Sequence, residues 1–309
     1  MILVVTNRED LTADWLILEL QRRGARYIRF NTEDYPQRVA LDWTPTDAVL
    51  RVGASEMAAG DLDAVWFRRP VRPRLRPGLT PAEAEWATRE AAEALDGFWR
   101  TLKTRWVSEP SAIRMADSKP RQLADAPALG WEIPDTEITN SPTRVSALAS
   151  RSPAGIVCKP LRGGRVRQSG GSLFFTTVVD PVTVEHLRDE PYLFQARVPK
   201  RYDIRVTVIG QEAFATRIEP RAGLTPDVDW RRTPQTSLRF TRERLPDEVS
   251  ERCVSTVEHY GLSFGAIDLA RRQDGGYTFF ELNPNGQWAF IEQATGQPLR
   301  AKLADQLGA

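Results

Sequence analysis

The chain has 309 residues, of which 41% are hydrophobic, so it can bury more than one hydrophobic core and is expected to be globular. Its formal net charge of +1 gives it no global field to attract nucleic acid or a membrane surface, and we expect neither as a partner. The opening apolar run is too short for a signal peptide or a membrane span, and Cys158 and Cys253 show no metal-ligand spacing, so a reduced cytoplasmic location is expected.

The first third of the sequence predicts an α/β unit. Residues 1–31 predict a strand, an amphipathic helix that stops at Gly24, and a second strand. The segment LDAVWFRRP predicts another strand, and a long helix is predicted after it, with Thr80 as its N-cap and Pro81 in its first turn. Strands that alternate with helices favour a mainly parallel sheet. We expect this unit to end near residue 105.

Two further units are expected after residue 105. Residues 106–190 combine helix and turn signals with two strand-like runs, which enclose the glycine-rich loop RGGRVRQSGG at residues 162–171. Residues 191–309 alternate strand-like runs, such as RYDIRVTVIG, with the predicted helix DEVSERCVSTVEHYG. These elements predict an α/β (α+β) protein in three parts.

The glycine-rich loop lies shortly after Lys159 and is a candidate phosphate site. Glycines let backbone N–H groups approach phosphate oxygens, and a lysine at the end of a strand adds a point charge. The chain contains no GxxxxGK[ST] motif, and no GxGxxG follows its first strand, so an ordinary turn is the alternative interpretation. Only five of the 42 basic residues are lysines, which makes Lys119, Lys159 and Lys200 informative, with plain surface lysines as the alternative.

Oxygen-bearing side chains lie in two strand-like runs near the C-terminus. Asp268 belongs to the first run, and Glu281 and Asn283 alternate onto one face of the second, with Leu282 on the other face. The turn signal DGG between the runs predicts a hairpin that brings the three polar residues together. Three such oxygen ligands suit Mg²⁺, and a solvated polar edge is the alternative.

Covalent catalysis by a protein nucleophile is not expected. The two histidines, His186 and His259, lie in helix-like polar segments without a companion ligand at metal spacing, and the chain contains no GxSxG motif. The remaining candidates are lysines, arginines and oxygen ligands, which together indicate a site that handles phosphate.

The sequence resembles the ATP-grasp ligases, specifically the ribosomal peptide maturases that make graspetides, the microviridin-type macrocyclases. The resemblance covers essentially the whole chain. It rests on VWFRRP (65–70), SKPRQLADAPALGWEIPDTEITN (118–140), VCKPLRGG (157–164), YDIRV (202–206), VDWR (228–231) and, most specifically, FELNPNGQWAFIEQATGQPL (280–299). It implies an ATP-grasp fold with an N-terminal pre-ATP-grasp α/β domain (1–105), a central domain (106–190) and a C-terminal domain (191–309).

The resemblance also implies roles for individual residues. ATP would be contacted at its phosphates, at an adenine hinge that runs from Gln195 to Val198, and near its ribose, by Lys119, Lys159, Gly163, Gly164, Gln195, Val198, Lys200 and Asp203. Two Mg²⁺ ions would be held by Asp268, Glu281 and Asn283. Lys159 would also take part in catalysis.

Two departures from the family pattern affect the expected substrate site. Ala196 stands where the family usually carries an acidic residue, so contact with the adenine amino group would depend on the backbone. No histidine lies between His186 and His259, so Arg205 and Arg231 are the expected catalytic clamps on the acceptor carboxylate and the γ-phosphate. Ordinary interdomain salt bridges are the alternative for both arginines.

The activity that the resemblance implies is the macrocyclisation of a ribosomal precursor peptide that carries a leader. ATP would phosphorylate a side-chain carboxylate, and a Ser or Thr hydroxyl or a Lys amine of the same peptide would attack it, giving an ω-ester or ω-amide ring. A homodimer is expected. The alternatives are a ligase for small amino acids or peptides, either glutathione-synthetase-like or glutamate-adding, and a non-catalytic subunit that binds the precursor.

Overall fold

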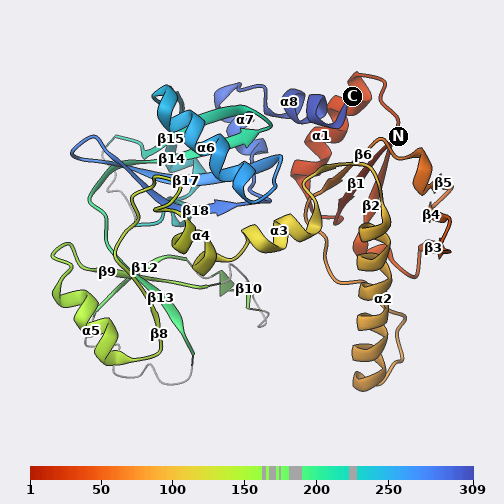
Figure 1. Ribbon diagram of the computed structural model, residues 1–309, viewed down its shortest axis with the longest axis horizontal. Helices are drawn as coiled ribbons and strands as arrows, with labels where there is room; N and C mark the ends of the chain where they lie inside the picture. The colour runs from red at the N-terminus through yellow and green to blue at the C-terminus, as the bar shows by residue number, and fades with distance from the viewer. Residues whose placement is uncertain (162–164, 167–171, 174, 181–189, 223–227) are drawn as a thin grey trace.

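The computed structural model describes residues 1–161, 165–166, 172–173, 175–180, 190–222 and 228–309. The predicted phosphate contacts Gly163 and Gly164, and most of the glycine-rich loop, lie outside these residues. Figure 1 shows three groups of elements: an N-terminal unit in red and orange, a middle unit in green, and a C-terminal unit in teal and blue. Among the described residues, no helix is both long and apolar enough to span a membrane.

A parallel sheet lies at the centre of the N-terminal unit. Its strands are β1 (Ile2–Thr6), β2 (Tyr27–Asn31), β6 (Ala64–Phe67) and β7 (Arg105–Val107), and the helix α1 (Leu11–Arg22) connects β1 to β2. The strand order is β2-β1-β6-β7, and each neighbouring pair is parallel. The apolar run of β1 is buried throughout, as is typical of a central parallel strand. The predicted strand, helix, strand start and mainly parallel sheet are confirmed.

A small antiparallel sheet packs beside the parallel one. Its strands are β3 (Val39–Trp43), β4 (Ala48–Val52) and β5 (Ser55–Ala58), and Val39, Leu50 and Met57 join the core that β1 forms. These three strands were not predicted from the sequence. Each strand buries only one or two side chains, so the alternation of apolar and polar residues is weak.

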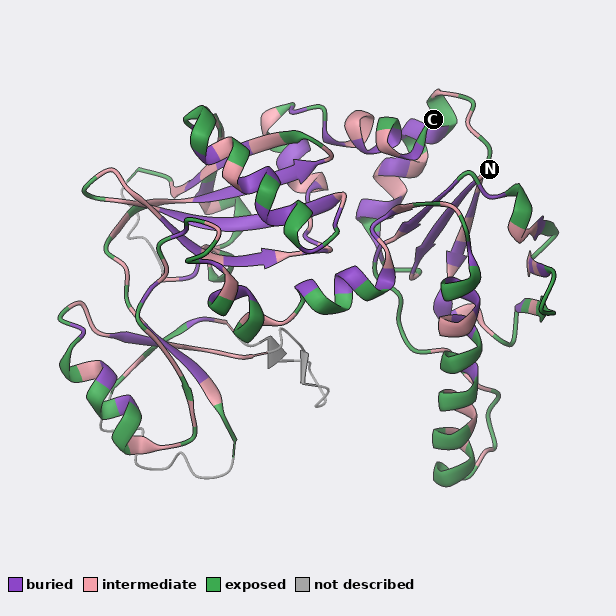
Figure 2. Cartoon of the chain, viewed as in Figure 1, coloured by how far each residue is buried: buried purple, intermediate pink, exposed green. Residues whose placement is uncertain are grey.

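The long helix α2 (Pro81–Thr101) begins where the sequence predicts. The Thr80 hydroxyl accepts the Glu83 N–H, the Glu83 carboxylate accepts the Thr80 N–H, and Pro81 takes the first helical position. Buried side chains are confined to its C-terminal half, from Ala91 onward. The N-terminal half, including Trp86 at 59% exposure, projects from the unit, as the green turns in Figure 2 show.

In the residues that the structure describes, the middle unit is a small antiparallel sheet with the helix α5 (Pro142–Ser150) against it. Its strands are β8 (Thr136–Thr139), β9 (Ile156–Lys159), the short β10 (Arg165–Val166) and β11 (Ser172–Leu173), β12 (Thr177–Val179) and β13 (Tyr192–Ala196). The four-stranded sheet has the order β12-β9-β13-β8. Its core is small and consists of Val145, Leu148, Ile156 and Phe194.

A five-stranded antiparallel sheet forms the C-terminal unit. Its order is β16-β15-β14-β17-β18, and its elements are β14 (Lys200–Ile209), β15 (Glu212–Pro220), β16 (Leu238–Glu243), α6 (Asp247–His259), β17 (Phe264–Arg272), β18 (Tyr277–Asn283), α7 (Ala289–Thr295) and α8 (Leu299–Leu307). One core joins this sheet to α6 and also includes Ala112 of α3 (Pro110–Ala116). A second core connects α8 with α1 and β1, and thereby joins the C-terminal unit to the N-terminal unit.

The predicted hairpin between the last two strands is confirmed. β17 and β18 pair antiparallel around the turn that contains Gly275, whose φ of +90° favours glycine. The register places Asp268 opposite Glu281 and Ala266 opposite Asn283. It shifts between Asp268 and Leu269, because Phe280 is an extra residue in β18.

Candidate active site

A cleft of about 510 Å³ lies between the middle sheet and the C-terminal sheet. Nine of the predicted site residues line it: Lys119, Lys159, Gln195, Val198, Lys200, Asp203, Arg231, Asp268 and Glu281. Arg205 and Asn283 do not line the cleft, but each donates a hydrogen bond to Asp268. The structure therefore brings together every predicted site residue that it describes.

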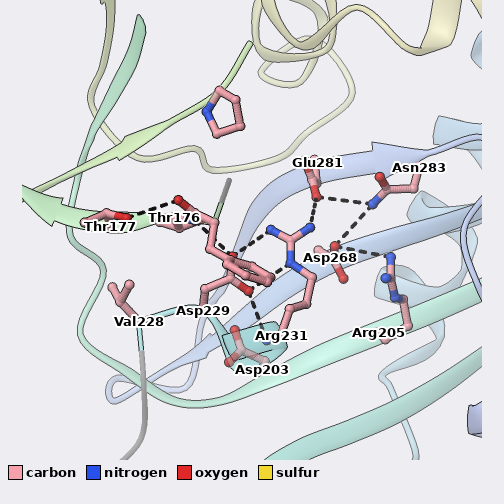
Figure 3. Close-up of polar contacts among 12 residues, drawn as sticks. Thr176, Thr177, Asp203, Arg205, Val228, Asp229, Arg231, Asp268, Glu281 and Asn283 are labelled. Carbon is pink, nitrogen blue, oxygen red and sulfur yellow. Dashed lines mark hydrogen bonds and ion pairs between the residues drawn. The ribbon is translucent and has the colours of Figure 1, made fainter. Parts of the chain in front are cut away.

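Asn283 contacts both of the other candidate metal ligands (Figure 3). Asn283 Nδ2 donates to Asp268 Oδ2 at 3.2 Å and to Glu281 Oε1 at 3.3 Å. Leu282, between Glu281 and Asn283, points the other way and is buried in the core. The alternation along β18 thus places both polar side chains on the cleft side.

Gln122 fixes the backbone of this strand from α4 (Lys119–Asp125). Its side chain accepts the Leu282 N–H at 2.8 Å and donates to the Leu282 carbonyl at 2.7 Å. Because β18 is an edge strand, these bonds replace those that a further strand would make. Sequence reasoning missed Gln122, and only its place three residues after Lys119 on the same helix links it to the site.

Opposite charges hold the two carboxylates. Lys119 Nζ lies 3.3 Å from Glu281 Oε2, Arg231 Nη1 lies 3.4 Å from Glu281 Oε1, and Arg205 Nη1 donates to Asp268 Oδ2 at 3.2 Å. Burial alone would raise the pKa of Glu281, but Lys119 and Arg231 outweigh it and lower that pKa well below its usual range. Burial, aided by the charge of Glu281, raises the pKa of Asp268 to about 6.

The same atoms fit a divalent cation. Asp268 Oδ1 is buried and has no hydrogen-bond partner among the described residues. It lies beside the carboxylate of Glu281 and the carboxamide of Asn283, whose oxygen can face a cation if the amide turns over. In the described part of the chain, no three His, Cys, Asp or Glu residues form a metal cluster, so this set consists of two carboxylates and one amide.

Lys159 projects into the cleft from the end of β9. Its ammonium lies 4.6 Å from the centre of the ring of Phe280, the extra residue of β18, which lines the cleft. Burial lowers the pKa of Lys159 to about 8, although the charge of Glu281 opposes the shift. Phe280 was not predicted as a site residue, because the bulge that exposes it depends on strand pairing.

Lys200 and Asp203 form an ion pair at the floor of the cleft. Lys200 Nζ donates to both carboxylate oxygens of Asp203, at 2.8 and 2.7 Å, and to the Val228 carbonyl at 3.0 Å. Burial raises the pKa of Asp203, while Lys200 opposes the shift. Asp203 and Arg205 share one face of β14, and the alternate residue Ile204 is buried in the core.

Asp229 connects Arg231 to the middle unit. It accepts hydrogen bonds from Arg231 Nε and Nη2, both at 2.8 Å, and from the Thr176 N–H at 3.1 Å. Asp229 and Glu281 together raise the pKa of Arg231 against the effect of burial. Trp230 packs on Phe240 and so anchors the segment that carries Arg231. Asp229 belongs to the VDWR segment but was not predicted as a site residue.

Both predicted arginine clamps are ion-paired in this structure. Arg205 pairs with Asp268, and Arg231 pairs with Asp229 and Glu281, all within the C-terminal unit. The Arg231 side chain is nevertheless 40% exposed, so part of it remains open to the cleft. Among the described residues, neither arginine forms an interdomain salt bridge, which was the alternative interpretation.

Comparisons with known proteins agree with this fold. Residues 1–114 match the model of the MvdD pre-ATP grasp domain family. The macrocyclase MdnC bound with precursor peptide MdnA, from Microcystis aeruginosa MRC, is 25% identical with a TM-score of 0.89, over 100% of this chain and 99% of that one. The macrocyclase MdnB from the same organism is 28% identical with a TM-score of 0.82, over 99% and 98% of the two chains.

A third similar structure is a RiPP-associated ATP-grasp ligase from Chryseobacterium gregarium in complex with ADP and a leader and core peptide. It is 24% identical with a TM-score of 0.89, over 99% of this chain and 96% of that one, and it has the same fold. No curated protein sequence matches the chain.

The fold and the cleft define an ATP-grasp ligase with a pre-ATP-grasp domain at its N-terminus. Within that class, the chain resembles the microviridin-type graspetide synthetases along its whole length, and the resemblance inferred from its sequence is confirmed.

Proposed function

We propose that the protein closes rings in a ribosomally made precursor peptide, using ATP to activate side-chain carboxylates of that peptide. The observation that carries this proposal is that Lys119, Lys159, Asp268 and Glu281 converge in one cleft between two sheets. The likeness of the whole chain to the macrocyclase MdnC supports a peptide as the acceptor.

The cleft is the proposed ATP site. Lys119 and Lys159 would neutralise the phosphates, and Gly163 and Gly164 of the glycine-rich loop are proposed to donate backbone N–H groups to them. The segment from Gln195 to Val198 begins within β13, the last strand of the middle sheet in chain order, and would flank the adenine. Lys200 and Asp203, which pair at the cleft floor, are proposed to lie near the ribose.

Asp268, Glu281 and Asn283 are the proposed Mg²⁺ ligands, for two ions. Bound Mg²⁺ would supply positive charge against the negative charge that develops on the transferring phosphoryl group. The unpartnered Oδ1 of Asp268 and the lowered pKa of Glu281 support this assignment, because both provide oxygen ready to ligate a cation.

The proposed reaction needs positioning more than a protein nucleophile. A carboxylate oxygen of the peptide attacks the γ-phosphorus, ADP leaves, and an acyl phosphate forms. A hydroxyl or amine of the same peptide then attacks the acyl carbon, and inorganic phosphate leaves with the bridging oxygen. Arg231, and Arg205 behind Asp268, are proposed to hold the acceptor carboxylate and the transferring phosphoryl group, and Lys159 to neutralise its charge.

The experiment that tests the proposal uses the purified protein, ATP, Mg²⁺ and a short peptide encoded beside its gene that carries repeated Thr and Asp or Glu. We expect ADP release that depends on the peptide, and a peptide mass lower by one water for each ring. ADP release with free amino acids or dipeptides, and no change in peptide mass, would favour a small-molecule ligase. Peptide binding without ADP release would favour a non-catalytic subunit.

Three broader expectations stay predictions. The division into domains at residues 105 and 190 can be tested by limited proteolysis; the second boundary falls just before β13, which pairs with β8 and β9. The homodimer can be tested by light scattering, and the cytoplasmic location by cell fractionation.

A further inference from the structure

The VWFRRP segment contains a fully buried arginine outside the proposed ATP and metal ligands. Arg68 follows β6 and has a relative exposure of 0%. Its Nη1 donates to the carbonyls of Asn285 and Gly286, the latter at 3.0 Å, and its Nη2 donates to Gln287 Oε1 at 3.0 Å. All three acceptors belong to the loop that directly follows Asn283 in β18.

The N-terminal unit places a carboxylate and an aromatic ring beside this arginine. Asp10 Oδ2 lies 3.5 Å from Arg68 Nε and is itself held by the Thr6 hydroxyl at 2.8 Å. The ring of Trp66 lies 5.7 Å from the guanidinium carbon. The Thr12 hydroxyl, at the start of α1, also donates to Gln287 Oε1. The turn after β1 and the end of β6 thus hold the loop together.

The opposite side of the loop is pressed against β17. A Cβ at Gly286 would lie 2.3 Å from the Cβ of Ala266, which is closer than side chains tolerate. Ala266 is also the cross-strand partner of Asn283, and the Gly286 N–H donates to the Asn283 carbonyl at 3.1 Å. The position of Gly286 therefore constrains the residue that begins the loop.

Burial of an arginine carries a desolvation penalty, so a gain in stability alone does not explain the position of Arg68. Burial lowers the pKa of Arg68 to about 9, although the charge of Asp10 opposes the shift, and this shows how strongly its charge is desolvated. Only a planar guanidinium offers several fixed N–H donors to two carbonyls and an amide oxygen at once. The arrangement favours orientation of the loop over simple packing.

We propose that Arg68 is a positioning residue, through which the N-terminal unit fixes the loop after Asn283 and so sets the affinity of the divalent cation site in the C-terminal sheet. The proposal rests on the metal role assigned to Asn283 under the proposed function. The N-terminal unit then acts on the cation site through this loop.

The test compares Mn²⁺ binding to the ADP complex, followed by electron paramagnetic resonance in the absence of peptide. Arg68→Lys and Arg68→Ala are expected to raise the Mn²⁺ Kd roughly tenfold or more, as loss of a residue that orients a ligand commonly does. The Kd for ADP without metal is expected to stay within about twofold of the parent value, because no ATP contact is removed. Added guanidinium ion is expected to restore part of the Mn²⁺ affinity of Arg68→Ala.

Arg23→Lys is the matched control. Arg23 also joins the N-terminal unit to the C-terminal unit, where it donates to the carbonyls of Ala301 and Ala309 and to Asp305 of α8, away from the loop. Its replacement is expected to lower the melting temperature and leave the Mn²⁺ Kd unchanged. Gln287→Leu, which removes one acceptor of Arg68, covers the case in which Arg68 variants do not fold, and is expected to raise the Mn²⁺ Kd severalfold.

Parent-like Mn²⁺ affinity in folded Arg68→Lys, or in Gln287→Leu where the Arg68 variants do not fold, would overturn the proposal. An equal loss in Arg23→Lys would also overturn it, because the effect would then follow general destabilisation. Since no peptide is present, a parent protein that binds Mn²⁺ but closes no rings would contradict the proposed function alone.

Discussion

At the scale of single residues, Asn283 is the residue on which the proposed cation site depends most. It is the sole described residue that donates hydrogen bonds to both Asp268 and Glu281. Asn283→Ala is expected to abolish Mg²⁺-dependent ADP release while the melting temperature changes little, because a polar group lost from a half-buried site costs little packing. ADP release at the parent rate from the purified variant would contradict the metal assignment.

The lowered pKa of Lys159 predicts that nucleotide binding depends on pH. Its pKa is lowered to about 8, so in the free protein it loses its proton as the pH rises through 8, and the phosphates then lose a positive partner. The Kd for ADP is expected to rise roughly tenfold between pH 7 and pH 9 in calorimetric titrations, since binding must then restore the proton. Lys159→Arg is expected to flatten this rise, because a guanidinium does not titrate there. A flat profile in the parent would show that Lys159 does not contact the phosphates.

Replacement of Arg205 or Arg231 by lysine tests whether the planar guanidinium, rather than its positive charge, is needed. Arg231 meets the Asp229 carboxylate with two N–H donors, Nε and Nη2, and Arg205 donates from Nη1 to Asp268. An ammonium cannot reproduce the planar arrangement of these donors. Arg205→Lys and Arg231→Lys are expected to bind ADP normally and to close rings at least about tenfold more slowly, a transition-state loss of about 1.4 kcal/mol or more.

The control for both is Arg239→Lys, which alters an exposed arginine paired with Glu219 and is expected to keep the parent rate. Ring closure at the parent rate in both clamp variants would remove Arg205 and Arg231 from the mechanism.

At the scale of elements, the N-terminal cap of α2 is expected to stabilise the first turns of the helix without much effect on the stability of the whole fold. Thr80→Ala removes a cap that commonly contributes about 1 kcal/mol, but the first half of α2 buries almost nothing. We expect faster amide hydrogen exchange in residues 81–90 and little change in the melting temperature, because the end of the helix can fray alone. Unchanged exchange in that segment would mean that the cap does not hold the projecting turns.

The same contrast explains what the sequence could predict. The α2 cap, the first strand, helix and strand, and the hairpin around Gly275 are encoded by neighbouring residues, and each was predicted. The exposure of Phe280 to the cleft depends on a register shift between two strands. The role of Gln122 depends on Leu282 in an edge strand, 160 residues away in the sequence. Sequence periodicity carries no signal for either.

The candidate site follows a similar rule. The alternation of side chains along the strands and the turn motif predicted that Asp268, Glu281 and Asn283 lie together. In the structure, Asn283 donates hydrogen bonds to both carboxylates. The ion pairs of Arg205 and Arg231 were not predicted from the sequence, because they depend on the fold: Asp268 reaches Arg205 through the pairing of β14 with β17, and Glu281 reaches Arg231 from β18.

At the scale of the whole molecule, contacts between segments that are far apart in the sequence hold the sides of the cleft together. Lys119 donates to the Pro160 carbonyl at 2.9 Å and also pairs with Glu281. The Thr176 N–H of the middle unit donates at 3.1 Å to Asp229, which binds Arg231. Arg68 adds the N-terminal unit to the same arrangement. All three units thus contribute to one site, as an enzyme that works chiefly by positioning requires.

The central claim is that a peptide carboxylate is activated as an acyl phosphate in this cleft, and oxygen transfer tests it most directly. A precursor peptide labelled with ¹⁸O in its side-chain carboxylates is incubated with the protein, ATP and Mg²⁺, and the released phosphate is analysed by mass spectrometry. The account predicts one ¹⁸O atom in inorganic phosphate for each ring closed, because the bridging oxygen leaves with the phosphate. Unlabelled phosphate alongside closed rings, or label in AMP, would contradict it.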